Sequence, residues 1–304
     1  MSVITATFNR APLLERLHDS LVGQVRHGEP FRDLEWVIVD DGSSDDTPVR
    51  IESWIAAAEL PITYIRQENA GKHVAVNRAV EVATGGYASI IDDDDVFAPN
   101  AFERMLYHWE TIPVAERHGF SGVVGLCADT NGIVIGDRFP SDPLDCSPAE
   151  LTYEHGITGD KQSLLRTDVL KRYPWPFSDL PGEVVVAIVW NRMSLEYRER
   201  HVNEIFAVKQ YLPGGISDRA LELQIRASVA TRQFYLEESR LPVRMPVTRR
   251  MRSYVNYARF SFHARARVAA QGREMRGNVR WLAMLPVGYG LYLRDRRRFG
   301  DLDG

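Results

Sequence analysis

Residues 87–95 read YASIIDDDD, an apolar run of strand-forming residues that ends in four consecutive aspartates. The same arrangement occurs twice earlier in the chain. Ser2–Phe8 leads into a polar segment, and Leu34–Val39 leads directly into Asp40 and Asp41. Short β-branched or apolar runs bounded by polar clusters are typical of buried strands. The sequence therefore predicts three strands whose carboxyl ends carry polar side chains.

Helical segments separate these strands. Leucines between residues 13 and 21 recur at helical spacing, Trp54 and Ile55 belong to a second such segment, and residues 75–83 form a third. A fourth short strand is expected at Ile62–Ile65. This alternation predicts the α/β class, with a Rossmann-like, mostly parallel sheet flanked by helices. Ligands of such sheets bind at the carboxyl ends of the strands.

The composition is that of a globular protein, but the charge is unevenly distributed. Of the 304 residues, 44% are hydrophobic and 26% are charged, which argues against a disordered or fibrous chain. The two cysteines, Cys127 and Cys146, form no CxxC motif, which argues against a zinc ribbon. Residues 1–243 hold 23 Lys and Arg against 37 Asp and Glu, whereas residues 244–304 hold 14 Arg against four acids. An acidic body followed by a basic segment suggests two parts with different partners.

The aspartate run Asp92–Asp95 is the sharpest chemical signal. Carboxylates stacked at the end of an apolar strand repel one another unless a cation neutralises them. Oxygen ligands favour Mg²⁺, Mn²⁺ or Ca²⁺. The alternative interpretation is an exposed acidic turn or a helix cap.

Two other polar clusters suggest a nucleotide. Asp40, Asp41 and Gly42 offer carboxylates for a base or a ribose, although helix capping explains them equally well. Asn69–Lys72 opens a helix with a lysine at its start, an arrangement that favours phosphate. The sequence contains neither GxGxxG nor GxxxxGK[ST], which argues against a Rossmann dehydrogenase or a P-loop NTPase.

Taken together, these segments resemble the family 2 glycosyltransferases, which have the GT-A fold. The resemblance rests on an ordered set of motifs over the first hundred or so residues: SVITATFNR, VIVDDGSSDDT, ENAGKHVAVNRA and IIDDDD. It continues more weakly to residues 190–192, as in bacterial members that build surface polysaccharides. The resemblance implies a GT-A catalytic domain over residues 1–215 and an Arg-rich helical C-terminal extension over residues 216–304.

The resemblance also implies site residues and an inverting reaction. Asp94 would bind Mg²⁺ or Mn²⁺, and Glu183 would be the general base that deprotonates the acceptor hydroxyl, with Asp179 and Asp160 as alternatives. The residues expected to bind the nucleotide of the sugar donor are Thr7, Asn9, Asp40, Asp41, Lys72, Asn77, Asp92 and Asp93. UDP is the favoured nucleotide, and the acceptor would be a glycan or a lipid-linked hydroxyl.

The Arg-rich segment allows several partners. Arginines interleaved with aromatic and aliphatic residues favour a membrane surface, while an acidic protein surface, in this or another copy of the chain, is a further alternative and nucleic acid is disfavoured. We therefore expect a cytoplasmic enzyme, peripheral on the inner face of the membrane. Two other functions remain open: a nucleotidyltransferase that makes a sugar nucleotide, and a non-catalytic module that binds membrane or nucleic acid.

Overall fold

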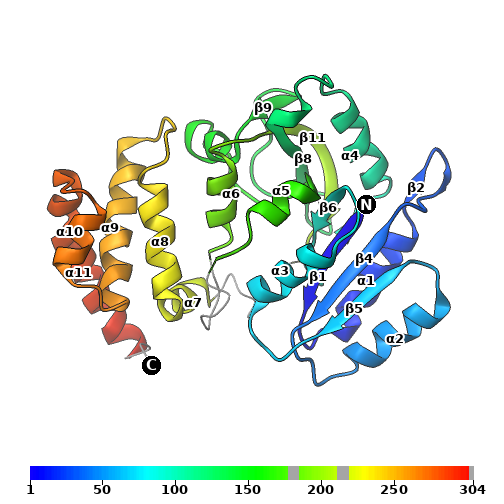
Figure 1. Cartoon of the computed structure of the whole chain (residues 1–304), viewed down its shortest axis with the longest axis horizontal. Coiled ribbons are helices and arrows are strands. Elements are labelled where there is room, and N and C mark those ends of the chain that lie inside the picture. Colours follow the sequence, from blue (N-terminus) through cyan, green and yellow to red (C-terminus); the bar gives the residue numbers. More distant parts are fainter. Residues whose placement is uncertain (177–184, 211–218, 301–304) are drawn as a thin grey trace. The chain divides into compact units, whose positions relative to one another are not determined.

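The structure is a computed structural model that describes residues 1–176, 185–210 and 219–300. Its contacts divide the chain into two compact units, drawn in Figure 1. The first unit comprises residues 1–174 and 193–211, and the second comprises residues 175–192 and 212–304. Residues 175–192 therefore group with the C-terminal segment, and the domain boundary near residue 215 stays a prediction.

The predicted N-terminal strands and helices are all present. The strands are β1 (Ser2–Thr7), β4 (Glu35–Asp40), β5 (Ile62–Arg66) and β6 (Tyr87–Ile90), and the helices that follow them are α1 (Ala11–Val22), α2 (Thr47–Ala57) and α3 (Lys72–Val82). The strands lie in the order β5-β4-β1-β6 and are mutually parallel. Parallel neighbours bring the carboxyl ends of these strands to one edge of the sheet, as the sequence predicts.

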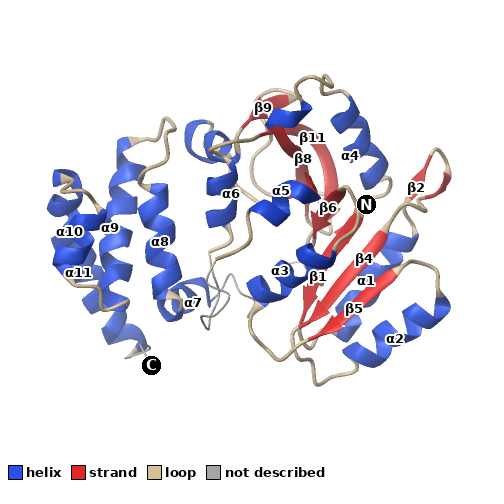
Figure 2. Ribbon diagram, viewed as in Figure 1, coloured by secondary structure: helices blue, strands red, loops and turns tan. Residues whose placement is uncertain are grey.

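The second half of the sheet is mixed rather than parallel (Figure 2). Strand β10 (Lys161–Arg166) runs antiparallel between β6 and β8 (Phe120–Ala128), and β11 (Arg198–Val208) pairs in parallel with β8. Two short strands pair antiparallel with β11. These are β7 (Val96–Phe97) and β9 (Leu144–Cys146). The remaining elements of this unit are β2 (Val25–Arg26), β3 (Glu29–Pro30), α4 (Ala101–Glu110), η1 (Arg117–Gly119), η2 (Glu150–Glu154) and α5 (Thr167–Arg172).

Helix α1 packs its apolar face on the sheet. Leu14 and Leu17 are fully buried there, and they share a core cluster with Trp36 of β4. The Trp36 indole N–H donates to Thr5 Oγ1 at 3.0 Å, so the one polar atom of this buried ring is satisfied. The core thus fixes the two strands from which the candidate site emerges.

The second unit is helical, as the C-terminal part of the sequence predicts. Its helices are α6 (Ala187–Met193), α7 (Ala220–Arg226), α8 (Ser228–Glu238), α9 (Val247–His263), α10 (Val268–Glu274) and α11 (Val279–Phe299). Arg259 of α9 pairs with Asp295 of α11 inside this unit, and both side chains are buried. Gly288 lets the same helices approach, because a Cβ there would lie 2.7 Å from the Ala258 Cβ. Within the described ranges, no helix combines the length and the apolar character needed to cross a membrane.

Candidate functional site

The polar turns that follow β1, β4 and β6 meet at the carboxyl edge of the parallel strands. Thr7 lies opposite Asp40 in the β1–β4 register, and the Asp41 amide donates to the Thr7 carbonyl at 2.9 Å. On the other side of β1, the Ile91 amide donates to the Ile4 carbonyl at 3.0 Å. The register therefore places the aspartate run beside the end of β1.

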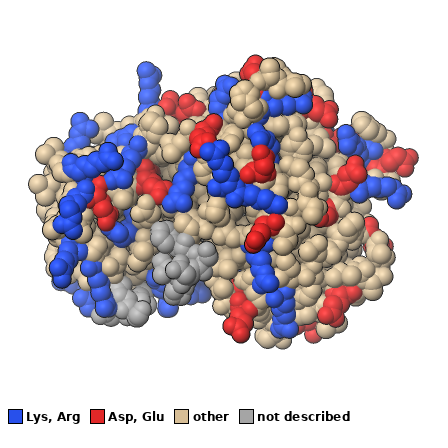
Figure 3. All heavy atoms as spheres, viewed as in Figure 1, with Lys and Arg blue, Asp and Glu red and all other residues tan. Residues whose placement is uncertain are grey.

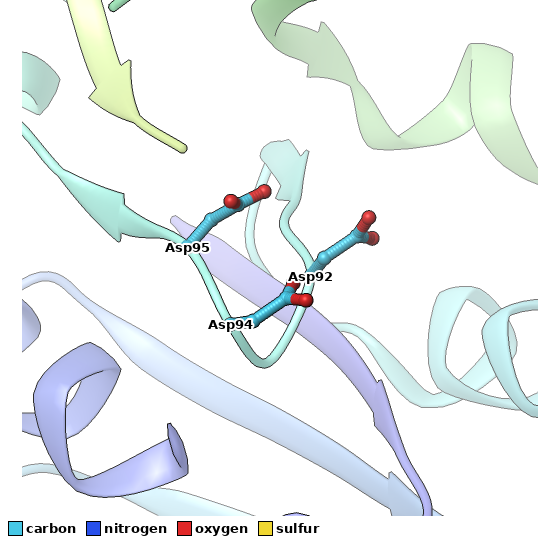
Figure 4. Close-up of side chains that lie close together, drawn as sticks. All are labelled: Asp92, Asp94 and Asp95. Carbon is cyan, nitrogen blue, oxygen red and sulfur yellow. The ribbon is translucent and has the colours of Figure 1, made fainter. Parts of the chain in front are cut away.

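Three of the four consecutive aspartates converge. Asp92, Asp94 and Asp95 each offer a carboxylate oxygen, and these oxygens lie within 4.8 Å of one another (Figure 4). The Asp95 amide donates to the Asp92 carbonyl at 3.2 Å, which closes a tight turn and brings the first and last side chains of the run together. Such a cluster of oxygens suits a hard divalent cation.

Three basic side chains neutralise this acidic cluster. The Lys72 ammonium lies 2.7 Å from Asp92, and Arg10 lies 2.7 Å from Asp94. Lys209, at the end of β11, contacts Asp95 at 2.5 Å. Burial raises the pKa of Asp95 to about 6 although Lys209 opposes the shift, whereas the charges of Lys72 and Lys209 outweigh burial and lower the pKa of Asp92.

Asp93 lies apart from these three carboxylates. Its Oδ2 accepts a hydrogen bond from the Thr7 hydroxyl at 2.8 Å, and its Oδ1 accepts one from Arg10 at 3.1 Å. The side chain is buried, and this burial raises the pKa of Asp93 to about 6 against the opposing charge of Arg10. Asp93 thus joins the turn after β6 to the turn after β1.

The two carboxylates after β4 hold backbone turns. Asp41 accepts from the amides of Ala70 and Gly71, both at 2.8 Å. Asp40 is fully buried and accepts from the Ser43 amide at 2.7 Å and from the Tyr64 hydroxyl at 2.9 Å. Each therefore shapes a loop at the edge of the sheet, and any contact with a base or a ribose would come in addition.

Asn9 joins the loops after β1 and β4. It has a positive φ of 54°, and its Oδ1 accepts from the Ser44 amide at 2.7 Å. Its own amide donates to the Ser43 hydroxyl at 2.9 Å. The Asp45 carboxylate accepts from the Thr47 amide at 3.0 Å and from the Ala11 amide at 3.2 Å, so it serves the starts of both α1 and α2.

A groove of about 520 Å³ adjoins these loops. Its lining residues are Gly42, Arg66, Gln67, Glu68 and Asn69. Gly42 has a φ of 91°, and a Cβ there would meet the Asn69 amide nitrogen at 3.1 Å, so this turn suits glycine. Lys72 begins α3 next to this groove, and the half-buried Asn77 lies farther along the same helix.

The sequence did not identify two residues that the structure brings to the acidic cluster: Arg10 and Lys209. Arg10 stands within a quoted motif, but nothing in the pattern assigned it a contact, and Asp95 was predicted only as part of the aspartate run, with no role of its own. Lys209 lies 114 positions from Asp95, so only the fold could reveal that pair. Among the predicted site residues, Glu183 and its alternative Asp179 lie outside the described residues, and Asp160 is exposed.

Sequence comparison assigns this edge of the sheet to a family. Residues 2–136, which contain all three polar turns, match the family described as Glycosyl transferase family 2. That segment of the chain is therefore similar to this family. The GalNAc(5)-diNAcBac-PP-undecaprenol beta-1,3-glucosyltransferase of Campylobacter jejuni is 31% identical over 129 residues, which are 42% of this chain and 38% of that protein. The matches to the first curated relatives span only 29–38% of their length.

Solved structures of glycosyltransferases confirm the GT-A fold. S. aureus TarS 1-349 in complex with UDP-GlcNAc aligns with a TM-score of 0.62 and 18% identity, covering 99% of this chain and 88% of that one. The mannosyltransferase PcManGT from Pyrobaculum calidifontis, in complex with GDP-Man and Mn²⁺, aligns with a TM-score of 0.56 and 21% identity, covering 99% and 83%. At these identities the likeness establishes the fold alone.

Proposed function

We propose that this protein is a family 2 glycosyltransferase. It would transfer a sugar from a nucleoside-diphosphate sugar, with UDP as the favoured nucleotide, to a hydroxyl group of a glycan or lipid-linked acceptor. The observation that carries the proposal is the meeting of Asp92, Asp94 and Asp95 at the carboxyl edge of the parallel strands, close to the loops after β1 and β4. The C. jejuni relative, named as a glucosyltransferase, and the TarS complex with UDP-GlcNAc support a sugar nucleotide as the donor.

The acidic cluster fits a divalent cation. It offers three carboxylate oxygens within 4.8 Å, the donor type that Mg²⁺ and Mn²⁺ prefer. We assign Asp94 as the principal ligand of the cation, with Asp92 and Asp95 as the other two protein ligands. When bound, such a cation neutralises the diphosphate that leaves from the sugar.

The basic residues of the cluster have a second role in this proposal. Lys72 and Arg10 now pair with Asp92 and Asp94, and a cation on those carboxylates would free both side chains to contact the donor phosphates. Charge on the diphosphate grows as the bond to the sugar breaks, so cationic groups placed there stabilise the transition state more than the ground state. Thr7, Asn9, Asp40, Asp41, Asn77 and Asp93 shape or line the nucleotide site.

We further propose that the reaction inverts the anomeric centre in a single displacement. This needs one base to take the proton of the acceptor hydroxyl, and Glu183 is our candidate from the family motif. An ordinary glutamate is ionised at neutral pH and can accept that proton. Exchanging Glu183 for Gln should abolish transfer while leaving nucleotide binding intact.

Our proposals about a membrane or protein partner rest on the Arg-rich second unit. On the face drawn in Figure 3, Lys and Arg side chains gather over the helices of this unit. Helix α11 exposes Val279, Leu282 and Leu293, and its single acid, Asp295, is buried against Arg259. An outward face of apolar and basic residues suits the surface of an anionic membrane, which would place the enzyme at the cytoplasmic face. Pairing with an acidic region of a second copy, in a homo-oligomer, is the alternative.

The direct test is the thermal stability of the full chain against nucleoside diphosphates, with and without Mn²⁺. A ligand at 100 times its dissociation constant stabilises by about 2.7 kcal/mol, or roughly 5–10 °C in melting temperature. We expect this shift with one nucleotide and only with metal, and we expect Asp94→Asn to remove it. The control is Glu59→Gln, which neutralises an exposed acid at the end of α2.

Two results would contradict the proposal. A melting temperature that no nucleotide raises, with or without Mn²⁺, would favour a non-catalytic module. Release of pyrophosphate from a nucleoside triphosphate would instead identify a nucleotidyltransferase.

A further inference from the structure

A pocket of about 590 Å³ lies within the helical second unit, and three arginines line it. The lining residues are Ser239, Arg240, Arg250, Tyr254, Met275, Arg276 and Asn278. They come from the end of α8, from α9 and from the link between α10 and α11. None of these lining residues is acidic, so the pocket carries three positive charges and no negative one.

Backbone carbonyls, rather than carboxylates, hold two of the arginines. Arg250 donates to the carbonyls of Ser239 at 2.7 Å and of Val243 at 3.1 Å. Arg240 donates to the carbonyl of Glu274. A carbonyl fixes a guanidinium group in place without neutralising its charge, and the charge of Arg240 also acts on the Glu274 carboxylate, whose pKa burial raises but Arg232 and Arg240 help to lower. The pocket therefore presents positioned positive charge, and not one half of an ion pair.

The nearest acids are engaged with other partners. The Glu274 carboxylate lies 2.6 Å from Arg232 and accepts from the Tyr257 hydroxyl at 2.7 Å. Glu238 is buried, and it accepts from the Ser253 hydroxyl at 2.6 Å. Neither carboxylate lines the pocket.

Arg276 is exposed, as is Arg240, whereas Arg250 is half-buried. Over the part of the chain that the structure describes, the Arg276 side chain makes no hydrogen bond or ion pair. Its backbone has a positive φ of 51°, in the short link between α10 and α11. The guanidinium of Arg276 is thus available to a ligand at the rim of the pocket.

The start of α11 adds to the positive potential. This helix has 21 residues, and Asn278 caps it by accepting from the amides of Arg280 at 2.9 Å and Trp281 at 3.3 Å. The amino end of a helix carries a partial positive charge that favours anions. Asn278 also donates to the Tyr254 hydroxyl at 3.1 Å, which leaves that hydroxyl able to donate its own hydrogen to a ligand.

We propose that this pocket binds a phosphoryl group, separately from the donor site of the first unit. Guanidinium groups match phosphate because their planar N–H forks donate two parallel hydrogen bonds. The floor of the pocket is less polar, since Met275 and Tyr254 are buried there. The proposed function gives this phosphoryl group a source, and the assignment rests on that function. The group would belong to the acceptor, either as a soluble phosphorylated glycan or as a lipid phosphate.

The first experiment is calorimetric titration of the full chain with inorganic pyrophosphate, in EDTA and at constant ionic strength set with chloride. EDTA removes divalent metal, so Lys72 and Arg10 of the first unit stay paired with Asp92 and Asp94 rather than with the probe. We expect saturable binding that Arg276→Gln and Arg240→Gln each weaken about tenfold. Arg273→Gln is the matched control, because it removes the same charge from an exposed position of α10 outside the lining. Circular dichroism melts verify that every variant is folded.

A second pair of titrations separates the two sources of phosphate. One uses glycerol 3-phosphate, and the other uses phosphatidylcholine vesicles with and without phosphatidic acid. If glycerol 3-phosphate or the phosphatidic acid vesicles bind in a way that depends on Arg276 but not on Arg273, the result supports the pocket. The probe that binds then identifies whether the phosphoryl group is soluble or part of a lipid. Equal affinity of the Arg276→Gln and Arg273→Gln variants for pyrophosphate, or no binding by the unmodified chain, would overturn the proposal. In the proposed function, nucleotide binding depends on the aspartates of the first unit and not on these arginines. A failure of nucleotide binding would therefore be distinguishable from a failure of phosphate binding in this pocket.

Discussion

Replacing Asp41 by Asn should loosen the loop that leads into α3, although the two side chains are nearly isosteric. Asp41 Oδ1 accepts from the Gln67 side chain at 2.7 Å and from the Ala70 amide at 2.8 Å, while Oδ2 accepts from the Gly71 amide. An amide group keeps one of these oxygens and turns the other into an N–H donor. The new donor would face the N–H of Gly71, so one hydrogen bond is lost and two lose their charged acceptor.

The magnitude follows from typical hydrogen-bond energies. Hydrogen bonds to charged groups contribute about 1.5–3 kcal/mol, against about 0.5–1.5 kcal/mol for neutral ones. Two bonds that each weaken by about 1 kcal/mol, plus one lost bond to a charged acceptor of about 2 kcal/mol, give about 4 kcal/mol. Since 1.4 kcal/mol corresponds to a factor of ten, amide hydrogen exchange at Ala70 and Gly71 should accelerate by roughly 500- to 1,000-fold.

The assay is hydrogen exchange measured by mass spectrometry on a peptide that spans residues 67–72. Asp46→Asn is the matched control, because Asp46 is exposed and its side chain makes no capping hydrogen bond to α2. The control should leave exchange in this peptide unchanged. Unchanged exchange in Asp41→Asn as well would refute the reasoning, because it would mean that the carboxylate does not hold the loop.

Two further predictions concern the helical unit and the response to pH. Gly288→Ala should destabilise the protein by about 1–3 kcal/mol in chemical denaturation, since its Cβ would lie 2.8 Å from the Val255 carbonyl oxygen, whereas Gly290→Ala, with open space around it, should stabilise by about 0.5–1 kcal/mol. Equal effects would show that the helices do not approach at Gly288. The hydrogen bond from Arg104 lowers the pKa of Glu204 below its usual 4.5, so its contribution is present above that pH and is lost as the pH falls through the lowered pKa. Glu204→Gln should therefore cost up to about 1 kcal/mol at pH 7 and progressively less below pH 4.5 in acid unfolding; a cost independent of pH would contradict this.

The parallel half of the sheet could be predicted because its signals are local. Short runs such as Trp36–Val39 are apolar throughout, which indicates burial on both faces, and each ends at a polar turn. The antiparallel insertion of β10 between β6 and β8 could not be predicted. Its register depends on two partner strands that both lie more than 30 positions earlier in the sequence. The same reason explains why Lys209 was missed. Residues 220–238 form two helices rather than one, since Ala227 adopts a non-helical ψ of 37° and separates α7 from α8.

The aspartate run shows how a backbone turn changes what a sequence motif means. Read as alternate residues, the motif singles out Asp92 and Asp94. The hydrogen bond from the Asp95 amide to the Asp92 carbonyl makes the four residues a turn, and the two ends of a turn lie close in space. Asp95 therefore joins the cluster with Asp92 and Asp94, which alternate spacing alone does not indicate.

Each carboxylate of this turn then meets a cation from a different part of the fold. Lys72 comes from the start of α3 and contacts Asp92, while Lys209 comes from the end of β11 and contacts Asp95. Arg10, from the loop after β1, contacts both Asp93 and Asp94. Four neighbouring carboxylates repel one another unless cations offset their charge, and these three basic side chains supply that offset. A divalent cation that enters the cluster must displace some of these contacts, which couples metal binding to the positions of α3, β11 and the loop after β1.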